Sequence, residues 1–126
     1  MKFIIPLTVI LLLTPAMIFS AELSSAERAN IDHLLAYLKT SGCDFNRNGK
    51  WYKADEAVQH LNKKYAYLLK KGLVSTAEDF IARAASESSM SGKPYQVRCG
   101  NNPPQPSGKW LTQELLRFRQ TKKLNP

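Results

Sequence analysis

The stretch from Asp44 to Asp55, DFNRNGKWYKAD, spaces its oxygen-bearing side chains as a calcium-binding loop does. Loop positions one, three, five, six and twelve are occupied by Asp44, Asn46, Asn48, Gly49 and Asp55. The match is incomplete, because such loops end on a bidentate Glu and this one ends on the shorter Asp. Lys50 and Lys53 also place positive charge in the loop, against only two carboxylates. We therefore expect no metal ion at these residues.

The same residues fit a β-hairpin better. Asn48-Gly49 is a preferred pair for a two-residue type I′ turn, since both residues tolerate positive φ. Residues 45–47 and 50–52 then form the two arms, and Asp55 is free to cap the helix that follows. The sequence predicts a turn rather than a calcium site.

His60 lies one helical turn from both Glu56 and Lys64. This spacing fits either a general acid–base pair or an exposed charge pair worth about 0.3 kcal/mol. We favour the surface pair, because a general base also needs a positioned substrate pocket. His33 lies opposite the apolar positions of its own predicted helix and is expected on the surface.

The segment Ser88–Tyr95, SSMSGKPY, has residue types found in acyl-transfer and phosphate-binding motifs, without their spacing. It contains no Ser-x-x-Lys motif, and Gly92-Lys93 is followed by Pro rather than by Ser or Thr. The segment is expected to end a helix and turn the chain. We assign no catalytic residue and no cofactor from the sequence.

The N-terminus has the layout of a secretory signal peptide. Lys2 precedes a charge-free apolar run, FIIPLTVILLLTPAMIF, and small residues follow at Ser20 and Ala21. The run is shorter than the roughly 20 residues of a membrane-spanning helix. We expect cleavage after Ser20 or Ala21. Residues 1–21 are then a signal peptide, and residues 22–126 form a single small domain.

Export decides how the two cysteines, Cys43 and Cys99, are interpreted. In an oxidising compartment an isolated pair most simply forms one disulfide. A free catalytic thiol and a zinc site are the alternatives, and zinc needs about four ligands where the chain adds only His33 and His60. The disulfide would tie a late predicted strand, Tyr95–Cys99, to the hairpin.

Apolar residues at helical spacing predict helices on both sides of the hairpin and the late strand. These helices are residues 25–40 behind a Ser24–Glu27 capping box, the stretch from the hairpin to Gly72, a stretch that opens at a Ser75–Glu78 capping box, and residues 109–121. Residues 100–108, GNNPPQPSG, are expected to form a rigid loop that pairs poorly in a sheet. The predicted fold is α+β and mostly helical, with about four helices, a small antiparallel hairpin, one further strand and one disulfide.

Two segments carry several irregular spacings, FNRNGKWYKADEAVQHLNKK and STAEDFIARAASESSMSGKPYQV, and both lie within residues 45–97. In these residues the chain resembles the YfeK-like family, small exported bacterial proteins classed as a domain of unknown function. The resemblance implies a periplasmic location in a Gram-negative bacterium. It implies no activity, because none is established for the family.

The chain is basic, with a formal net charge of +8. Cationic side chains gather on the polar face of the second predicted helix and near the C-terminus, at Lys63, Lys64, Lys70, Lys71, Arg117, Arg119, Lys122 and Lys123. Such a surface either is simply solvated or attracts an anionic partner, such as lipopolysaccharide, phospholipid head groups or an acidic protein. Nucleic acid is not an expected partner, because export removes most of it from reach and the aromatic residues are poorly placed for stacking on bases.

We favour a non-enzymatic periplasmic binding or interaction module whose contact surface joins the turn at Arg47 to the serine-rich segment. The candidate binding residues are Arg47, Asn48, Tyr52, Ser89, Ser91, Lys93 and Tyr95. Loops held by a rigid scaffold commonly carry recognition. Two alternatives stay open: an immunity-type inhibitor of an envelope-targeting toxin, and a small periplasmic enzyme that uses Glu56 and His60.

Overall fold

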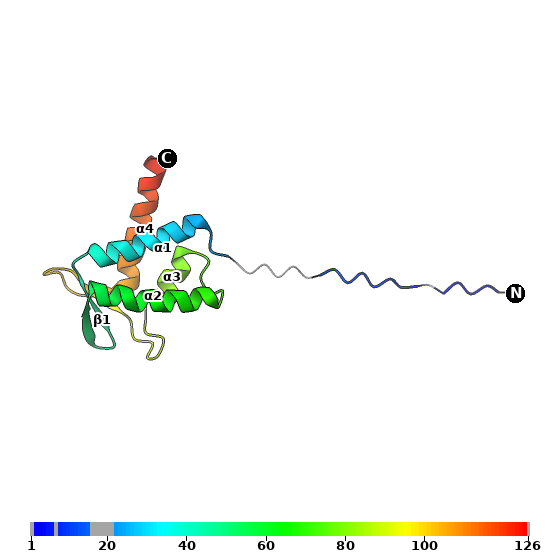
Figure 1. Cartoon of the computed structure of the whole chain (residues 1–126), viewed down its shortest axis with the longest axis horizontal. Helices are drawn as coiled ribbons and strands as arrows, with labels where there is room; N and C mark the ends of the chain where they lie inside the picture. The colour runs from blue at the N-terminus through cyan, green and yellow to red at the C-terminus, as the bar shows by residue number, and fades with distance from the viewer. Residues whose placement is uncertain (1, 7, 16–21, 126) are drawn as a thin grey trace.

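Residues 22–125 form four α-helices and a four-stranded antiparallel sheet, joined by one disulfide (Figure 1). This computed structural model describes residues 2–6, 8–15 and 22–125. The expected cleavage site at Ser20 and Ala21 lies outside the described residues. Within the described ranges, no helix is both long enough and apolar enough to cross a membrane. The predicted α+β, mostly helical fold is confirmed.

The helices cover the stretches that the apolar spacing predicts. Their bounds are Ser25–Thr40 for α1, Ala54–Lys70 for α2, Ala77–Ala84 for α3 and Ser107–Leu124 for α4. The bounds of α1 are those predicted. α4 begins at Ser107 rather than at residue 109 and ends at Leu124 rather than at residue 121. It begins early because Pro106 ends the extended segment before it and takes the N-cap position.

A hairpin forms where the calcium-like spacing lies. Strands β1 (Asp44–Arg47) and β2 (Lys50–Lys53) pair antiparallel across Asn48 and Gly49, whose φ angles are 53° and 83°. Two consecutive positive φ angles are those of a type I′ turn, so the hairpin prediction is confirmed.

Two later strands extend the sheet in the order β2-β1-β3-β4. β3 (Gln96–Arg98) pairs with β1, and β4 (Gln105–Pro106) pairs with β3 through Val97 and Gln105. The sequence predicted β3 but not β4, because the proline-rich loop was expected to pair poorly. The short strand forms because Pro106 lies on an edge strand, where a missing backbone N–H is tolerated.

The predicted N-cap role of Asp55 is wrong. The N-cap position of α2 is Lys53, whose side chain makes no capping hydrogen bond, and Asp55 lies inside the first turn. β2 continues to Lys53 and passes directly into the helix, which leaves no room for a cap at residue 55. Asp55 and Glu56 instead place negative charge near the positive end of the α2 dipole, which stabilises the helix.

The predicted N-caps of α1 and α3 are close to those in the structure. Ser24 accepts a hydrogen bond from the Glu27 backbone N–H at 3.2 Å. At α3 the cap is Thr76, which accepts from the Asp79 N–H at 3.0 Å. This cap lies one residue later than the predicted Ser75–Glu78 box.

Cys43 and Cys99 form the predicted disulfide, with a Cα–Cα distance of 4.4 Å. It joins the residue before β1 to the residue after β3, so it fixes the hairpin to the rest of the sheet. Closing a loop between residues 56 apart stabilises the fold by about 4 kcal/mol in the chain-entropy account, an upper figure.

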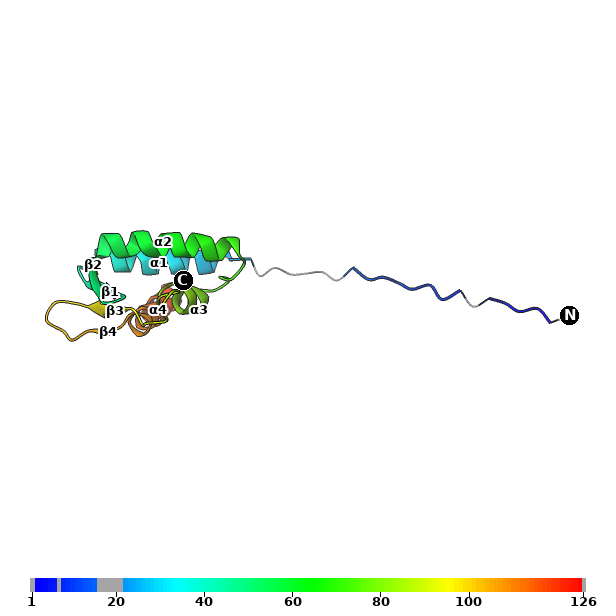
Figure 2. The same cartoon turned by 90° about the horizontal axis from the view of Figure 1, so that it is seen from below.

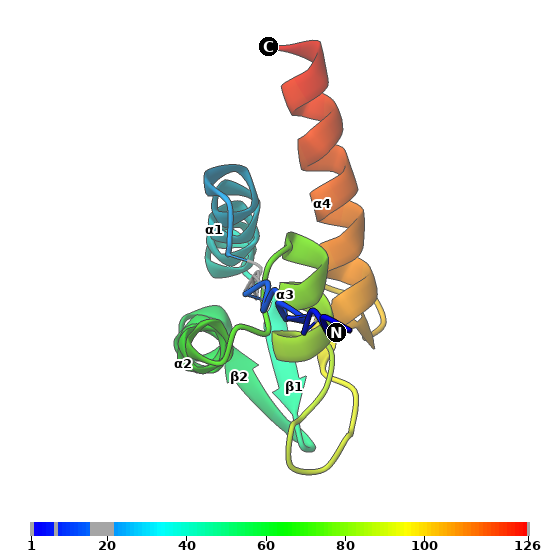
Figure 3. The same ribbon diagram turned by 90° about the vertical axis from the view of Figure 1, so that its right-hand side faces the viewer.

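The hydrophobic core lies between two pairs of helices. α1 and α2 run side by side, α3 and α4 pack below them, and the sheet lies at one end (Figure 2). The fully buried large side chains are Ile31, Leu34, Leu38, Val74, Phe80, Val97, Leu111 and Leu115. Burying each of them contributes roughly 1.5–3 kcal/mol. The C-terminal part of α4 extends past this core (Figure 3).

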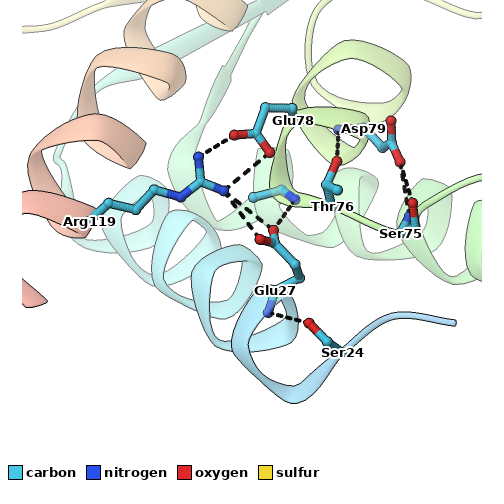
Figure 4. A network of polar contacts seen from close by, with 8 residues as sticks. Ser24, Glu27, Ser75, Thr76, Glu78, Asp79 and Arg119 are labelled. Atoms are coloured by element: carbon cyan, nitrogen blue, oxygen red, sulfur yellow. Dashed lines mark hydrogen bonds and ion pairs between the residues drawn. The ribbon is translucent and has the colours of Figure 1, made fainter. Parts of the chain in front are cut away.

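A polar network ties α1, α3 and α4 together (Figure 4). Glu27 accepts a hydrogen bond from the buried Ala77 N–H at 2.6 Å and one from Arg119 Nη2 at 3.3 Å. Arg119 also pairs with Glu78. Arg117 pairs in turn with the buried carboxylate of Glu114. The arginines predicted as part of a basic C-terminal surface are therefore largely neutralised by acidic partners.

The expectation that His33 lies plainly on the surface is wrong. Its ring stacks on Phe118 with centroids 3.7 Å apart, and its Nε2 lies 3.7 Å from the buried Glu114 carboxylate. α4 crosses α1 at this point, so the side of α1 that looked free in the sequence is covered.

Candidate functional site

A cleft of about 280 Å³ opens between the β1–β2 hairpin and α2. β1 ends at Arg47, which brings its guanidinium over the first half of α2. Glu56, His60 and Lys63 lie along that helix at successive turns and line the cleft. Tyr95, the residue before β3, also lines the cleft and is buried.

Arg47 and His60 are in direct contact. Arg47 Nη1 lies 2.5 Å from His60 Nδ1 and 3.2 Å from His60 Nε2, and His60 Nε2 also lies 3.2 Å from the Tyr95 hydroxyl oxygen. A guanidinium can only donate hydrogen bonds, so we assign the nearer ring nitrogen, Nδ1, as its acceptor, which places the proton of the neutral imidazole on Nε2. His60 therefore donates to Tyr95.

Lys64 completes the cluster from the next turn of α2. Its Nζ donates to the Glu87 carbonyl oxygen at 2.8 Å and to the Tyr95 hydroxyl at 3.3 Å. The same nitrogen lies 5.0 Å from the centroid of the Tyr95 ring, which is the geometry of a cation–π contact. Tyr95 accepts from both His60 and Lys64, which leaves its own hydroxyl proton available to donate.

The electrostatics of this cluster disfavour additional positive charge. Burial lowers the pKa of His60, and the nearby cations Arg47, Lys64 and Lys63 lower it further. Burial also lowers the pKa of Lys64, with Glu87 opposing the shift and Arg47 adding to it. Both causes favour the neutral form of His60. A negative charge bound nearby would act in the opposite direction and favour the protonated ring.

A second hollow adjoins the cleft and shares with it Arg47, His60, Lys63 and Tyr95. Its outer wall comes from the loop at residues 86–94. This loop is fastened to the hairpin, because the Ser91 hydroxyl donates to Asn48 Oδ1 at 2.6 Å. The cleft and the hollow form one continuous surface around the hydrogen-bonded cluster.

The structure brings most of the predicted contact residues together. Arg47, Tyr52 and Tyr95 line the cleft, and Asn48 and Ser89 line the adjoining hollow. Ser91 reaches the same surface by its bond to Asn48. Lys93 contributes its backbone N–H, which donates to Ser91 Oγ at 3.2 Å, and its side chain lines neither concavity.

His60 and Lys64 belong to the cluster, although the favoured interpretation of their spacing was an exposed charge pair on the surface. The partners of His60 are Arg47 and Tyr95, which are 13 and 35 residues away along the chain. In the sequence, the only indication of this cluster was that Glu56, His60 and Lys63 recur on one side of α2. The partners on the hairpin and at Tyr95 are visible only in the fold.

Asp44, the first residue of the calcium-like spacing, is engaged by cations. Its carboxylate lies 3.4 Å from Lys53 Nζ and 3.5 Å from Arg98 Nη2. Within residues 22–125 the structure shows no group of three His, Cys, Asp or Glu side chains arranged to hold a metal ion.

A family model described as a family of unknown function, DUF5329, matches residues 25–119. The chain belongs to this family. It is 40% identical over 97 residues to the uncharacterised protein YfeK of Salmonella typhimurium strain LT2, a match that covers 75% of this chain and 77% of that protein. The predicted relationship to YfeK-like proteins is confirmed, and the family match extends beyond residues 45–97 at both ends. No solved structure matches the chain.

Proposed function

We propose that this protein is an exported, non-enzymatic binding module, and that the cleft beside Arg47 holds an anionic group of an envelope component. The N-terminal apolar segment, with the layout of a signal peptide, supports export. The ligand group would be a phosphate or a carboxylate, since both match the planar fork of an arginine.

The observation that carries the proposal is the excess of hydrogen-bond donors around the cleft. Arg47, Lys63 and Lys64 are donors only, and Tyr95 has a proton to give. Glu56 is the carboxylate that lines the cleft beside them. Cations that converge at a partly enclosed surface raise the local concentration of anions and strengthen their binding.

An enzyme that uses Glu56 and His60 is the second candidate, and one observation favours it, because both residues line the same cleft. The contacts of His60 oppose it. Nδ1 is occupied by Arg47, and the lowered pKa makes the imidazole a weak base. An immunity-type inhibitor would use the same basic surface on an acidic toxin, and a toxin gene beside this one would favour that form of the proposal.

The test is a titration of the ¹⁵N-labelled protein with inorganic phosphate, glycerol 3-phosphate and acetate, followed by NMR. We expect saturable shifts at Arg47, His60 and Tyr95 with at least one of these anions. Arg47→Ala and Lys63→Ala should each weaken binding by about tenfold, the loss of one charged hydrogen bond.

Lys70→Ala is the matched control, because it removes the same charge from an exposed position near the far end of α2. It should change the affinity by less than about twofold, because only a weak, salt-screened attraction reaches the cleft from that distance. Shifts that never saturate, or an equal loss from Lys63→Ala and Lys70→Ala, would show that anions sense only the net charge and would overturn the proposal.

A further inference from the structure

Two exposed apolar side chains stand beside the cationic cluster. Met90 is 96% exposed at the tip of the 86–94 loop, and Tyr67 on α2 is 60% exposed. Both line the hollow that shares Arg47, His60 and Lys63 with the cleft. Single exposed apolar residues are common on protein surfaces. Here the two apolar side chains lie next to a cleft rich in hydrogen-bond donors. An amphipathic anion would fit this arrangement, with its charged group in the cleft and its apolar part against Met90 and Tyr67.

The exposure of Met90 is fixed by the hydrogen bonding of its loop. The Ser88 N–H donates to the Lys93 carbonyl oxygen at 2.9 Å, and the Gly92 N–H donates to the Ser88 carbonyl oxygen at 2.8 Å. The Met90 N–H also donates to Ser88 Oγ at 3.3 Å. With the Ser91–Asn48 bond, these contacts hold the tip beside the hairpin turn, so Met90 is presented outward without a large ordering cost on binding.

Both segments at this end of the molecule, the loop and the hairpin, carry basic residues. Lys50 lies in the hairpin beside Arg47, and Lys93 lies in the loop. The hairpin end and the loop project from the same end of the domain (Figure 3). A cation near an anionic lipid surface strengthens binding by about fivefold, so several together with an apolar tip give measurable attachment. Tyrosine is favoured at the boundary between head groups and acyl chains.

We infer that this surface docks on an anionic phospholipid bilayer, with a lipid phosphate in the cleft and Met90 and Tyr67 at the head group–acyl boundary. The inference rests on the proposed function, since it names the anion of the same cleft. A bilayer fits better than an acidic polypeptide, because Met90 borders the hollow from a loop tip and is 96% exposed there. The docked chain would lie on the membrane as a peripheral protein.

The experiment measures partition of the exported form of the protein onto vesicles by sedimentation. Vesicles of phosphatidylglycerol and phosphatidylcholine in equal parts are compared with vesicles of phosphatidylcholine alone, across a series of NaCl concentrations. We expect binding to the anionic vesicles, weakening with salt. Met90→Ser should lower the partition coefficient by about tenfold, the loss of one buried apolar side chain. Arg47→Ala should lower it by a similar factor.

Leu116→Ser is the matched control, because Leu116 is 56% exposed on α4 and lines neither concavity. It should change the partition coefficient by less than about twofold, as expected for a residue outside the contact. Equal losses from Met90→Ser and Leu116→Ser would overturn the docking surface. Binding that depends on Met90 but not on Arg47 would overturn the placement of a lipid phosphate in the cleft.

Two further outcomes separate this inference from the proposed function. Saturable binding of glycerol 3-phosphate, with no binding to anionic vesicles, would leave the anion site standing and overturn membrane docking. A synthetic Glu-rich peptide with one Leu that binds in a Met90-dependent manner, while anionic vesicles do not, would overturn the bilayer in favour of an acidic polypeptide.

Discussion

Replacing Glu27 by alanine should destabilise the fold more than removing Arg119, the cation with which it pairs. Glu27 accepts the Ala77 N–H at 2.6 Å, and Ala77 is fully buried, so the variant leaves this donor without its partner. An unsatisfied buried N–H costs about 1–3 kcal/mol. The contact with Arg119, whose side chain is 31% exposed, adds up to about 1 kcal/mol. Together the two contributions span about 1–4 kcal/mol, and the expected loss for Glu27→Ala is about 2–3 kcal/mol, the middle of that range.

Arg119→Ala should lose only about 1 kcal/mol in total, because its pairs with Glu27 and Glu78 are partly exposed and Glu27 keeps its bond to the Ala77 N–H. Glu27→Gln separates the two contributions, since an amide oxygen still accepts from that N–H while the charge is lost. Urea denaturation followed by circular dichroism measures all three variants, and Glu27→Ala should shift the midpoint by about 1 M or more with an unchanged slope. If Glu27→Ala is no less stable than Arg119→Ala, the buried N–H is not what the carboxylate satisfies, and the reasoning fails.

Two further predictions concern the disulfide and the acid stability. Replacing Cys43 and Cys99 together by alanine should lower the free energy of unfolding by up to about 4 kcal/mol while the helical circular dichroism at low temperature is retained; loss of the helical signal in the folded state would contradict this. The hydrogen bond from Arg119 lowers the pKa of Glu78 below its ordinary value of 4.5, so the folded state binds fewer protons than the unfolded state near that pH. The stabilisation by Glu78 is complete above about pH 4.5 and is lost as the pH falls through the lower folded pKa. Glu78→Gln should thus be less stable than the unmodified protein at neutral pH and equally stable in strong acid, and a stability difference that persists in acid would refute the assignment.

The parts of the fold that follow from local chemistry were predictable from the sequence. Asn48-Gly49 specifies its turn by the backbone angles that both residues tolerate, and the turn fixes the register of both strands beside it. The helices follow from apolar residues repeated at 3.6-residue spacing, which needs no knowledge of the partner surface. The disulfide follows from an isolated cysteine pair and an expected oxidising compartment.

The parts that depend on distant residues were not predictable from the sequence. One hydrogen bond of the predicted capping box forms, from the Glu27 N–H to Ser24 Oγ. The Glu27 carboxylate instead accepts from Arg119, which is 92 residues away along the chain. β4 forms where Gln105 pairs with Val97 on the edge of β3, a contact that the composition of its loop argued against.

The candidate site shows the same division. The turn and the serine-rich segment were predicted to share one surface, and the Asn48–Ser91 bond joins them. His60 and Lys64 both contact Tyr95, which lies just before β3. The apolar spacing of α2 alone does not tell where Tyr95 lies.

The central claim, that an anion binds against the Arg47–His60–Tyr95 cluster, is tested most directly by the pKa of His60. ¹H NMR titration gives this pKa with and without saturating sulfate, whose charge does not change near neutral pH. Without the anion, the pKa should lie below the ordinary value of 6.5, because burial and nearby cations disfavour the imidazolium. With the anion bound beside Arg47 the pKa of His60 should rise, since a nearby negative charge favours the protonated ring. A His60 pKa that is the same with and without sulfate, in a protein whose Arg47 is intact, would contradict the claim.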